Sequence, residues 1–418
     1  MNQALAGKTA HAVSEFVNWL DRYGETSYDH QSYYAGPIGR RAKALYYSKP
    51  LLGTMAVSPM VVSEAFLPAA RRLFWKPQRF PIADAHYAMG FAFLAEVQRS
   101  ERHYERAIHF LEELEKSRCQ GFRDYCWGYP FDWQTRSGVI AEGTPLITTL
   151  PYVYEAFSQV HALGKKTKWL GIMKSIAEHA FSSYRDVPTG ENAASCGYTP
   201  APDDPAGVVN ASAYRAILLT KAGLELGVPK YLEVARKNLN FVLASQNDDG
   251  SWFYSTDGAR DFVDHFHTCF VLKALGKIQQ LTHWVECTKA IERGIGYYLK
   301  NLFDAQGLPL PFSRRPRMTV YKRELYDYAE CINLGVLLGG QFPDFENRLS
   351  AVVTDLLARW RKTDGSFRAR ELLLGWDNTP MHRWAQAQLF RSLTFMLARE
   401  AKAGVHGDVR PVEAGARR

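Results

Sequence analysis

Three kinds of segment are missing from the sequence, and each absence excludes a class of protein. No run approaches the roughly 20 consecutive apolar residues of a membrane-spanning helix, so we expect no integral membrane segment. Residues 1–10 contain Lys8 and no apolar centre, so we expect no secretory signal peptide in the sequence as written, and whether a targeting segment has been removed stays open. The six cysteines are scattered, without the paired spacing of a metal site. The simplest prediction is a reduced, cytoplasmic protein with no metal and no cofactor.

A block of basic residues is also missing. The formal net charge is +8, but Lys and Arg are spread along the chain and no nucleic-acid-binding motif accompanies them. We therefore expect no nucleic-acid partner. Two interpretations of the charge stay open, a mild preference for anionic partners and a solvated basic surface with no specific partner.

A repeated unit is what the sequence does contain. Gly121, Gly190, Gly250, Gly307 and Gly365 each follow an amphipathic helical pattern and precede a long polar and aromatic loop. Their spacing of roughly 60 residues is typical of stacked repeats. The connections between the other helix ends are short. This alternation predicts an inner and an outer layer of helices, with every long loop at one end of the molecule.

Helical periodicity gives the expected boundaries. The expected helices include residues 10–22, 58–75, 81–97, 104–115, 167–184 and 231–245, with further ones starting near residues 144, 209, 261, 325 and 378. The tyrosine-rich segment 28–47 is expected to wrap the ring of helices or to reach over its mouth. Residues 401–418, rich in Gly, Ala and charge, are expected to be a disordered tail.

One stretch resembles a known repeat. The run from Arg236 to Trp252, which ends Gln246-Asn-Asp-Asp-Gly250-Ser-Trp252, resembles the Gln-Trp repeat of terpenoid cyclases, with weaker echoes at 304–307 and 362–367. The chain as a whole resembles the α/α toroid that these cyclases share with six-hairpin glycosidases, uronyl hydrolases, polysaccharide lyases and epimerases. The resemblance implies an all-α fold of about six helical hairpins, with residues 1–400 as one domain and residues 1–76 completing the ring.

A second stretch narrows the resemblance. The loop Cys126-Trp127-Gly128-Tyr129-Pro130-Phe131-Asp132-Trp133, followed by Gly143-Thr-Pro-Leu-Ile-Thr148, resembles uncharacterised toroids from bacterial extracellular-polysaccharide clusters. This resemblance implies a saccharide ligand. The basic loops favour an anionic one.

The candidate catalytic residues lie in the long loops or in the first turns of the inner helices. A hydrolase needs two carboxylates that flank the scissile bond. A lyase or epimerase needs a base that removes the proton next to a uronate carboxylate, and a cation that neutralises that carboxylate. The residues of these types are Asp132, Asp264, His265, Tyr326, Asp377 and His382.

Each of these candidates has an ordinary structural alternative. Asp264 and Asp377 stand where a helix begins, and a carboxylate there commonly caps the helix. His265 and His267 would point away from each other on a helix, so zinc binding is not expected.

The candidate substrate-binding residues are aromatic side chains, which stack on sugar rings, and arginines, whose planar guanidinium groups bind carboxylates through two hydrogen bonds. They are Trp127, Tyr129, Trp133, Tyr254, Arg315, Arg323 and Arg383. The alternatives are an aromatic plug at the end of the toroid and solvated arginine loops.

Three functions stay open on these grounds. The leading hypothesis is a protein that acts on an acidic poly- or oligosaccharide in bacterial extracellular polysaccharide biosynthesis or processing, as a glycoside hydrolase, lyase or epimerase. The second is a non-catalytic saccharide-binding or assembly factor on the same fold. A terpenoid cyclase or prenyltransferase is remote, because Pro202-Asp203-Asp204-Pro205 lacks the Asp-x-Asp-Asp pattern of the protonating cyclases.

Overall fold

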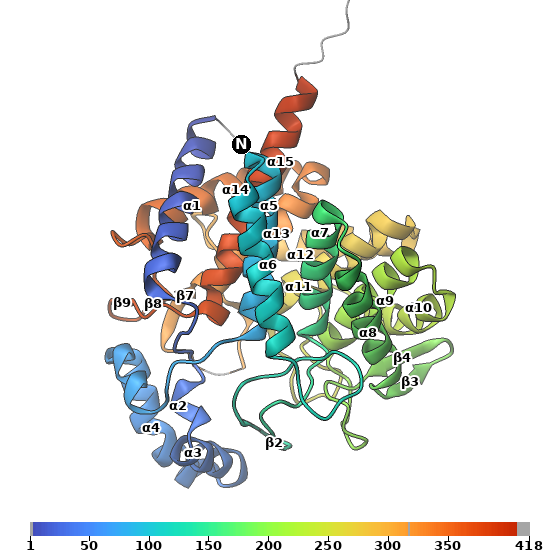
Figure 1. Ribbon diagram of the computed structural model, residues 1–418. Helices are drawn as coiled ribbons and strands as arrows, with labels where there is room; N and C mark the ends of the chain where they lie inside the picture. Colours follow the sequence, from blue (N-terminus) through green and yellow to red (C-terminus); the bar gives the residue numbers. More distant parts are fainter. Residues whose placement is uncertain (1–2, 317, 408–418) are drawn as a thin grey trace, which may run out of the picture.

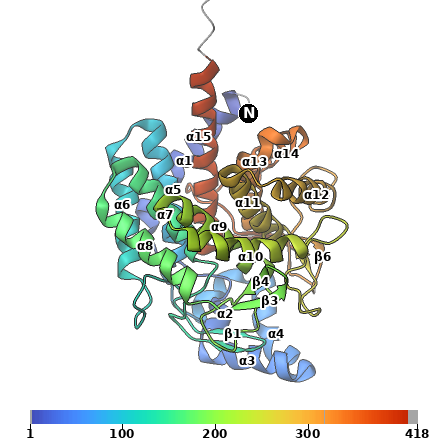
Figure 2. The same ribbon diagram turned by 90° about the vertical axis from the view of Figure 1, so that its right-hand side faces the viewer.

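The computed structural model describes residues 3–316 and 318–407, and its core is a closed ring of helices (Figures 1 and 2). Within these residues, six inner helices contact one another in sequence order, and the last contacts the first. They are α5 (Pro81–Gln98), α7 (Leu150–Gly164), α9 (Val209–Leu226), α11 (His265–Thr282), α13 (Leu325–Leu338) and α15 (Ala387–Gly407). The ring confirms the predicted all-α toroid.

An outer helix packs on each inner helix. The outer helices are α1 (Gln3–Tyr23), α6 (Glu101–Lys116), α8 (Thr167–Ser182), α10 (Pro229–Ala244), α12 (Val285–Asn301) and α14 (Pro343–Asp355). Because α1 contacts α15, the N-terminal helix closes the outer layer.

The difference between the layers follows from their sequences. Inner helices such as α9 bury nearly every residue, since they are apolar on several faces. Outer helices such as α6 bury a single stripe, here Ala107, Phe110, Leu111 and Leu114. One apolar stripe is what a helix needs when solvent lies on its other side.

In two of the repeats, the glycine turn that follows an outer helix packs closely against the next outer helix. Gly250 and Gly365 adopt left-handed φ values of 93° and 94°. A Cβ atom at either position would lie 2.4 Å from a backbone oxygen, that of Arg293 in α12 or that of Glu15 in α1. Only glycine allows this approach. After the first of these turns, Trp252 Nε1 donates a hydrogen bond of 3.0 Å to the carbonyl of Val242, so Trp252 covers the end of α10.

The long loops lie at the end of the ring where the inner helices begin, which we call the mouth. Short strands in these loops form three two-stranded sheets and one three-stranded sheet within the described residues, paired β1–β2, β3–β4, β5–β6 and β7–β8–β9. Their bounds are β1 (Trp133–Thr135), β2 (Gly138–Ile140), β3 (Asp186–Gly190), β4 (Ala193–Cys196), β5 (Val263–Asp264), β6 (Phe312–Arg314), β7 (Tyr321–Glu324), β8 (Arg370–Leu372) and β9 (Trp376–Asp377). Four further short turns are η1 (Pro68–Leu73), η2 (Gly339–Gln341), η3 (Leu356–Trp360) and η4 (His382–Gln386).

An N-terminal insertion projects from the mouth end of the ring (Figure 1, blue). It consists of α2 (Ser32–Ala35), α3 (Pro37–Ser48), α4 (Pro50–Phe66) and η1. Ion pairs to the loops at the mouth hold it, among them Arg71 with Asp377 and Glu64 with Arg370. The first 76 residues therefore do two things: α1 completes the ring, and the insertion reaches over the mouth.

Several boundaries differ from the prediction. The helices expected to start near residues 144 and 378 begin later, at Leu150 and Ala387. The helix expected over 58–75 begins earlier, at Pro50, and ends at Phe66, because Pro68 starts a separate turn. Helix α15 continues to Gly407, into the segment expected to be a disordered tail. Residues 408–418 of that tail lie outside the described residues.

Candidate active site at the mouth of the toroid

Aromatic side chains from successive loops gather around the mouth. Trp133 lies 5.5 Å from Tyr129 and 6.1 Å from Tyr198 between ring centroids. On the other side, the rings of Tyr254 and His267 are 4.7 Å apart. Burial raises the pKa of the Tyr254 hydroxyl to about 12. Burial, with Tyr129 and Tyr254 nearby, also raises the pKa of Tyr198. These hydroxyls are protonated at neutral pH and can serve as hydrogen-bond donors to a ligand.

His267 is oriented by Asp264. The Asp264 carboxylate caps α11 by accepting the backbone N–H of His267 at 2.8 Å, and its second oxygen lies 2.6 Å from His267 Nδ1. The carboxylate therefore fixes the proton on Nδ1 and leaves Nε2 as an acceptor, the arrangement that makes a histidine a general base. Nε2 makes no hydrogen bond within the described chain, and the side chain is 22% exposed.

Tyr326 lies across the same patch of aromatic rings. Its ring stacks on Trp384 at 4.2 Å, and Phe266 lies 5.2 Å from Tyr326 and 4.4 Å from His267. Burial raises the pKa of the Tyr326 hydroxyl well above its ordinary value, so this group is a proton donor and not a base at neutral pH. The sequence prediction had left both roles open.

Arg383 brings a positive charge to the mouth. Its Nε and Nη2 donate to the Asp29 carboxylate at 2.9 and 2.6 Å, and its guanidinium lies 4.6 Å from the centre of the Tyr129 ring. Burial alone would raise the pKa of Asp29, but Arg383 and His30 outweigh it and hold this pKa well below its ordinary value. The Arg383 guanidinium thus uses Nε and Nη2 to bind Asp29, while its third nitrogen, Nη1, makes no hydrogen bond within the described chain.

Some of the predicted site residues converge at the mouth. The candidate site therefore consists of Asp264 and Tyr326 from the predicted catalytic set and of Tyr129, Trp133, Tyr254 and Arg383 from the predicted binding set. Sequence reasoning missed the roles of His267, Asp29, His30, Tyr198, Phe266 and Trp384. A signal existed for His267, because a side chain three residues after a capping Asp lies beside its carboxylate.

His265 and His382 do not face the mouth, which corrects their expected orientation. His265 Nδ1 donates to the carbonyl of Leu310 at 3.1 Å, and its Nε2 accepts from Tyr298 of the outer helix α12 at 2.7 Å. His382 donates from Nε2 to the carbonyl of Gly24 at 3.0 Å and accepts from Tyr87 at 2.6 Å. Burial lowers the pKa of His265 to about 3 and of His382 to about 4. Both imidazoles are therefore uncharged at neutral pH, and both are packed inside the wall of helices and loops that surrounds the mouth.

Asp132 and Asp377 are at the rim rather than free at the centre. Asp132 forms an ion pair with Arg40 of α3 and accepts the backbone N–H of Glu142 at 2.9 Å. Asp377 is fully buried against Arg71. Both carboxylates attach the N-terminal insertion to the loops, so neither has the free oxygens that an acid or nucleophile needs.

Three of the predicted binding residues also lie elsewhere. Trp127 is buried inside the ring wall, where its Nε1 donates to the carbonyl of Leu114 at 2.8 Å. Arg323 is paired with Asp304 and with Glu371 of the long loops, so two carboxylates already neutralise its charge. Arg315 is exposed in the loop after β6 and contacts none of the residues at the mouth.

Below the mouth, the axis of the ring is polar and buried. One turn deeper, the hydroxyls of Tyr152 and Tyr214 are 2.6 Å apart, and Phe270 lies 5.3 Å from Tyr214. These three side chains form the floor of the mouth. Beneath this floor, Lys273 forms a buried ion pair with Glu330. Deeper still, Glu155 pairs with Lys277 and with Arg391. The floor separates these charges from the mouth.

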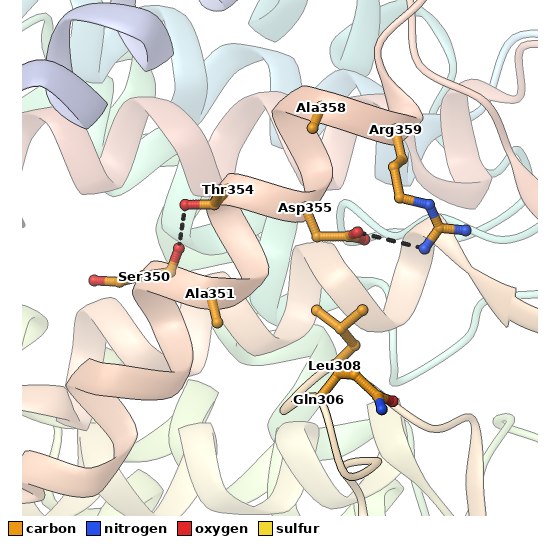
Figure 3. A pocket seen from close by; sticks show the side chains of 8 residues that line it. All are labelled: Gln306, Leu308, Ser350, Ala351, Thr354, Asp355, Ala358 and Arg359. Carbon is orange, nitrogen blue, oxygen red and sulfur yellow. Dashed lines mark hydrogen bonds and ion pairs between the residues drawn. The ribbon is translucent and has the colours of Figure 1, made fainter.

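A depression on the outer surface is a different feature. It has a volume of about 490 Å³ and is lined by Gln306, Leu308, Ser350, Ala351, Thr354, Asp355, Ala358 and Arg359 (Figure 3). Arg359 lies 3.3 Å from Asp355 in this depression. None of the predicted site residues lines it, so the mouth is the candidate site.

The structure also bears on metals and membranes. Among residues 3–316 and 318–407, no three His, Cys, Asp or Glu side chains are grouped as metal ligands would be. In the same part of the chain, no helix has both the length and the apolar character needed to cross a lipid bilayer.

Solved structures with the same fold are carbohydrate-active enzymes. A heparin-specific unsaturated glucuronyl hydrolase superposes with a TM-score of 0.62 at 10% identity, over 96% of this chain and 98% of that chain. Cellobiose 2-epimerase from Bacillus thermoamylovorans gives 0.60 at 8% identity, over 77% and 88%. A polysaccharide lyase gives 0.54 at 10% identity, over 78% and 91%. No protein-family model and no curated protein matches the sequence.

These similarities define the class of fold. The protein has the α/α-toroid fold of these enzymes, which confirms the fold that the sequence resemblance implied. At these identities the likeness establishes the fold alone, because one fold hosts many chemistries. The chemistry has to be argued from the mouth.

Proposed function

We propose that the protein acts on an acidic saccharide at the mouth, as a lyase or epimerase. The single observation that carries this proposal is the pair formed by Asp264 and His267, whose free Nε2 lies among aromatic rings. A hydrolase of the two-carboxylate type is less well supported, since Asp132, Asp264 and Asp377 each have a bound partner.

The proposed reaction begins with proton abstraction. His267 Nε2 takes the proton from the carbon next to the uronate carboxylate, and the Arg383 Nη1 donor stabilises the charge that develops on that carboxylate. In a lyase, the neighbouring C–O bond then breaks, and the leaving oxygen takes a proton from the Tyr326 hydroxyl. In an epimerase, a proton returns to the opposite face of the same carbon. Neither route needs an oxidant.

Binding would come from the aromatic side chains. Tyr129, Trp133, Tyr254 and Trp384 offer ring faces on different sides of the mouth. Tyr129, Trp133 and Tyr254 also offer hydroxyl or indole donors, whereas the indole N–H of Trp384 already donates to Glu324. The setting in bacterial extracellular polysaccharide biosynthesis or processing is part of the same proposal, and it comes from the loop of residues 126–133.

The test is an activity assay on the purified protein with acidic oligosaccharides. The formation of unsaturated uronides is followed by ultraviolet absorbance, and epimerisation by proton NMR. We expect His267→Gln to reduce turnover by about 10²- to 10⁴-fold, the usual contribution of a general base, and to leave ligand affinity nearly unchanged. His283→Asn is a matched control, because His283 lies at the opposite end of α11 with a φ of 58° that Asn tolerates.

A second candidate function is a non-catalytic saccharide-binding factor. It is favoured by the ion pair of Arg383 with Asp29. This pair largely neutralises the Arg383 charge before any ligand binds, so less of it is left to stabilise a reacting carboxylate. A protein of this kind binds the oligosaccharide, turns over none of it, and loses affinity when Tyr254 is changed to Ala. Equal turnover by wild type and His267→Gln would rule out the proposed base.

A further inference from the structure

Helix α4 has two apolar stripes on opposite sides. Gly53, Val57 and Met60 are buried against the rest of the insertion. Leu51, Met55, Val62 and Phe66 follow one another at intervals of four, seven and four residues, which places them on one face of the helix. Their exposed fractions are 87%, 73%, 55% and 59%. A helix in water normally has one apolar stripe, so the second stripe needs a partner.

Further exposed apolar side chains lie in the segments next to α4. Leu67 and Leu73 follow α4 with exposed fractions of 68% and 81%, and Ile38 of α3 is 78% exposed. Nothing in the described chain covers these side chains. Single exposed apolar residues are common, but four on one helical face with three more in the adjoining segments mark an interaction surface.

Basic residues surround this apolar face. Between Gly36 and Pro77 the sequence holds seven basic residues and one acidic residue, Glu64. Glu64 is paired with Arg370. Lys49 directly precedes α4, while Arg72 and Lys76 follow it, and all three are exposed with no ion pair in the described chain. The face therefore combines exposed apolar side chains with uncompensated positive charge at both ends.

We propose that this face of α4 binds an anionic lipid membrane surface, with the helix lying in the plane of the headgroups. Apolar residues on one side and Lys or Arg along the edge are the features of interfacial helices. The positive ends would attract anionic lipid headgroups. A second copy of the chain is a poorer partner, because it would bring the same positive charges together.

This inference goes beyond the proposed function and does not depend on the chemistry at the mouth. The insertion is attached to the rim by Arg40, Glu64 and Arg71 and lies at the mouth end of the ring (Figures 1 and 2). Membrane binding through α4 would therefore bring the mouth close to the lipid surface. The substrate class that follows is a saccharide presented at a membrane.

The test is sedimentation of the full chain with vesicles of phosphatidylcholine alone or mixed equally with phosphatidylglycerol. We expect binding to the anionic vesicles that falls as salt is raised. Leu51→Ser/Met55→Ser/Phe66→Ser should weaken it at least tenfold. Lys49→Gln/Arg72→Gln/Lys76→Gln should remove the preference for phosphatidylglycerol. The melting curve by circular dichroism checks that each variant is folded.

A matched control uses apolar residues at the opposite end of the ring. Leu163, Leu224 and Leu281 are 40%, 46% and 41% exposed near the ends of α7, α9 and α11. Changing all three to Ser should leave vesicle binding unchanged. The proposal is overturned by wild-type protein that stays in the supernatant, by equal binding to both kinds of vesicle, or by an equal loss in this control. A lipid-free dimer that the α4 variant converts to a monomer would also overturn it, because the face would then belong to a second copy.

Discussion

Two histidines stand two residues apart on α11 and lie in different regions of the molecule. His265 is in the wall, where a carbonyl and a tyrosine hydroxyl occupy both ring nitrogens. His267 is at the mouth, where Asp264 holds one nitrogen and leaves the other free. In the wall, polar side chains such as His265 form their hydrogen bonds with other groups of the protein. At the mouth, some polar atoms have no partner in the described chain and can bind a ligand. Substitutions in the two regions should therefore have different effects.

The largest effect is expected deep in the ring, at Glu330. Glu330→Gln would leave the buried Lys273 without its partner charge. Such a loss typically costs about 3–5 kcal/mol in the free energy of unfolding. Chemical denaturation of the purified variant measures it.

A double variant separates loss of the pair from loss of packing. Replacing both residues together, as Lys273→Met/Glu330→Met, removes both charges and should recover most of the lost stability. A single variant as stable as wild type would mean that solvent reaches Lys273, so the contrast between a dry axis and an open mouth would be wrong.

The fold could be predicted to a large extent because it depends on patterns that the sequence displays. Helix α10 ends at Ala244, one residue before the expected boundary, and the turn at Gly250 follows it as expected. The inner and outer layers of helices were predicted from the alternation of long and short connections. For residues 28–47 the sequence left two placements open, around the ring or over its mouth. The exposed position of α4 could not be predicted, because its second apolar stripe resembles that of a buried helix in the sequence.

The site could be predicted only in part. The position of Tyr326 and Asp264 in the first turns of inner helices placed them at the correct end of the ring. The rotation of each helix about its own axis decides between mouth and wall, and this rotation is set by packing between distant segments. His382, for example, is held by Gly24, and Arg383 beside it is held by Asp29. These partners are more than 350 residues away in sequence, so no local pattern indicated them.

The next effect is a loss of stability in mild acid, caused by the wall histidines. The pKa of His382 falls from 6.5 to about 4 on folding, so the unfolded chain binds the proton more readily. The contribution of this histidine is fully present above pH 6.5 and is lost as the pH falls towards 4. The full loss is about 3 kcal/mol, and His265 acts in the same direction. Denaturation at pH 7.5 and at pH 4.5 measures it.

A control distinguishes these histidines from exposed ones. His283→Asn should leave the pH dependence unchanged, whereas His382→Gln should lower stability at pH 7.5 and flatten its dependence on pH. A dependence that is the same in wild type and His382→Gln would assign the acid sensitivity to other groups.

The smallest effect is expected at the rim, at Asp132. Its ion pair with Arg40 joins side chains that are 36% and 26% exposed, and pairs of this kind contribute about 1 kcal/mol or less. Asp132→Asn should therefore shift the free energy of unfolding by no more than that. It should leave turnover of an acidic oligosaccharide unchanged, because the carboxylate holds the insertion and not the substrate. The opposite outcome is a variant that keeps its melting temperature but loses as much turnover as His267→Gln. Asp132 would then be a catalytic residue, and the active site would include the rim of the mouth.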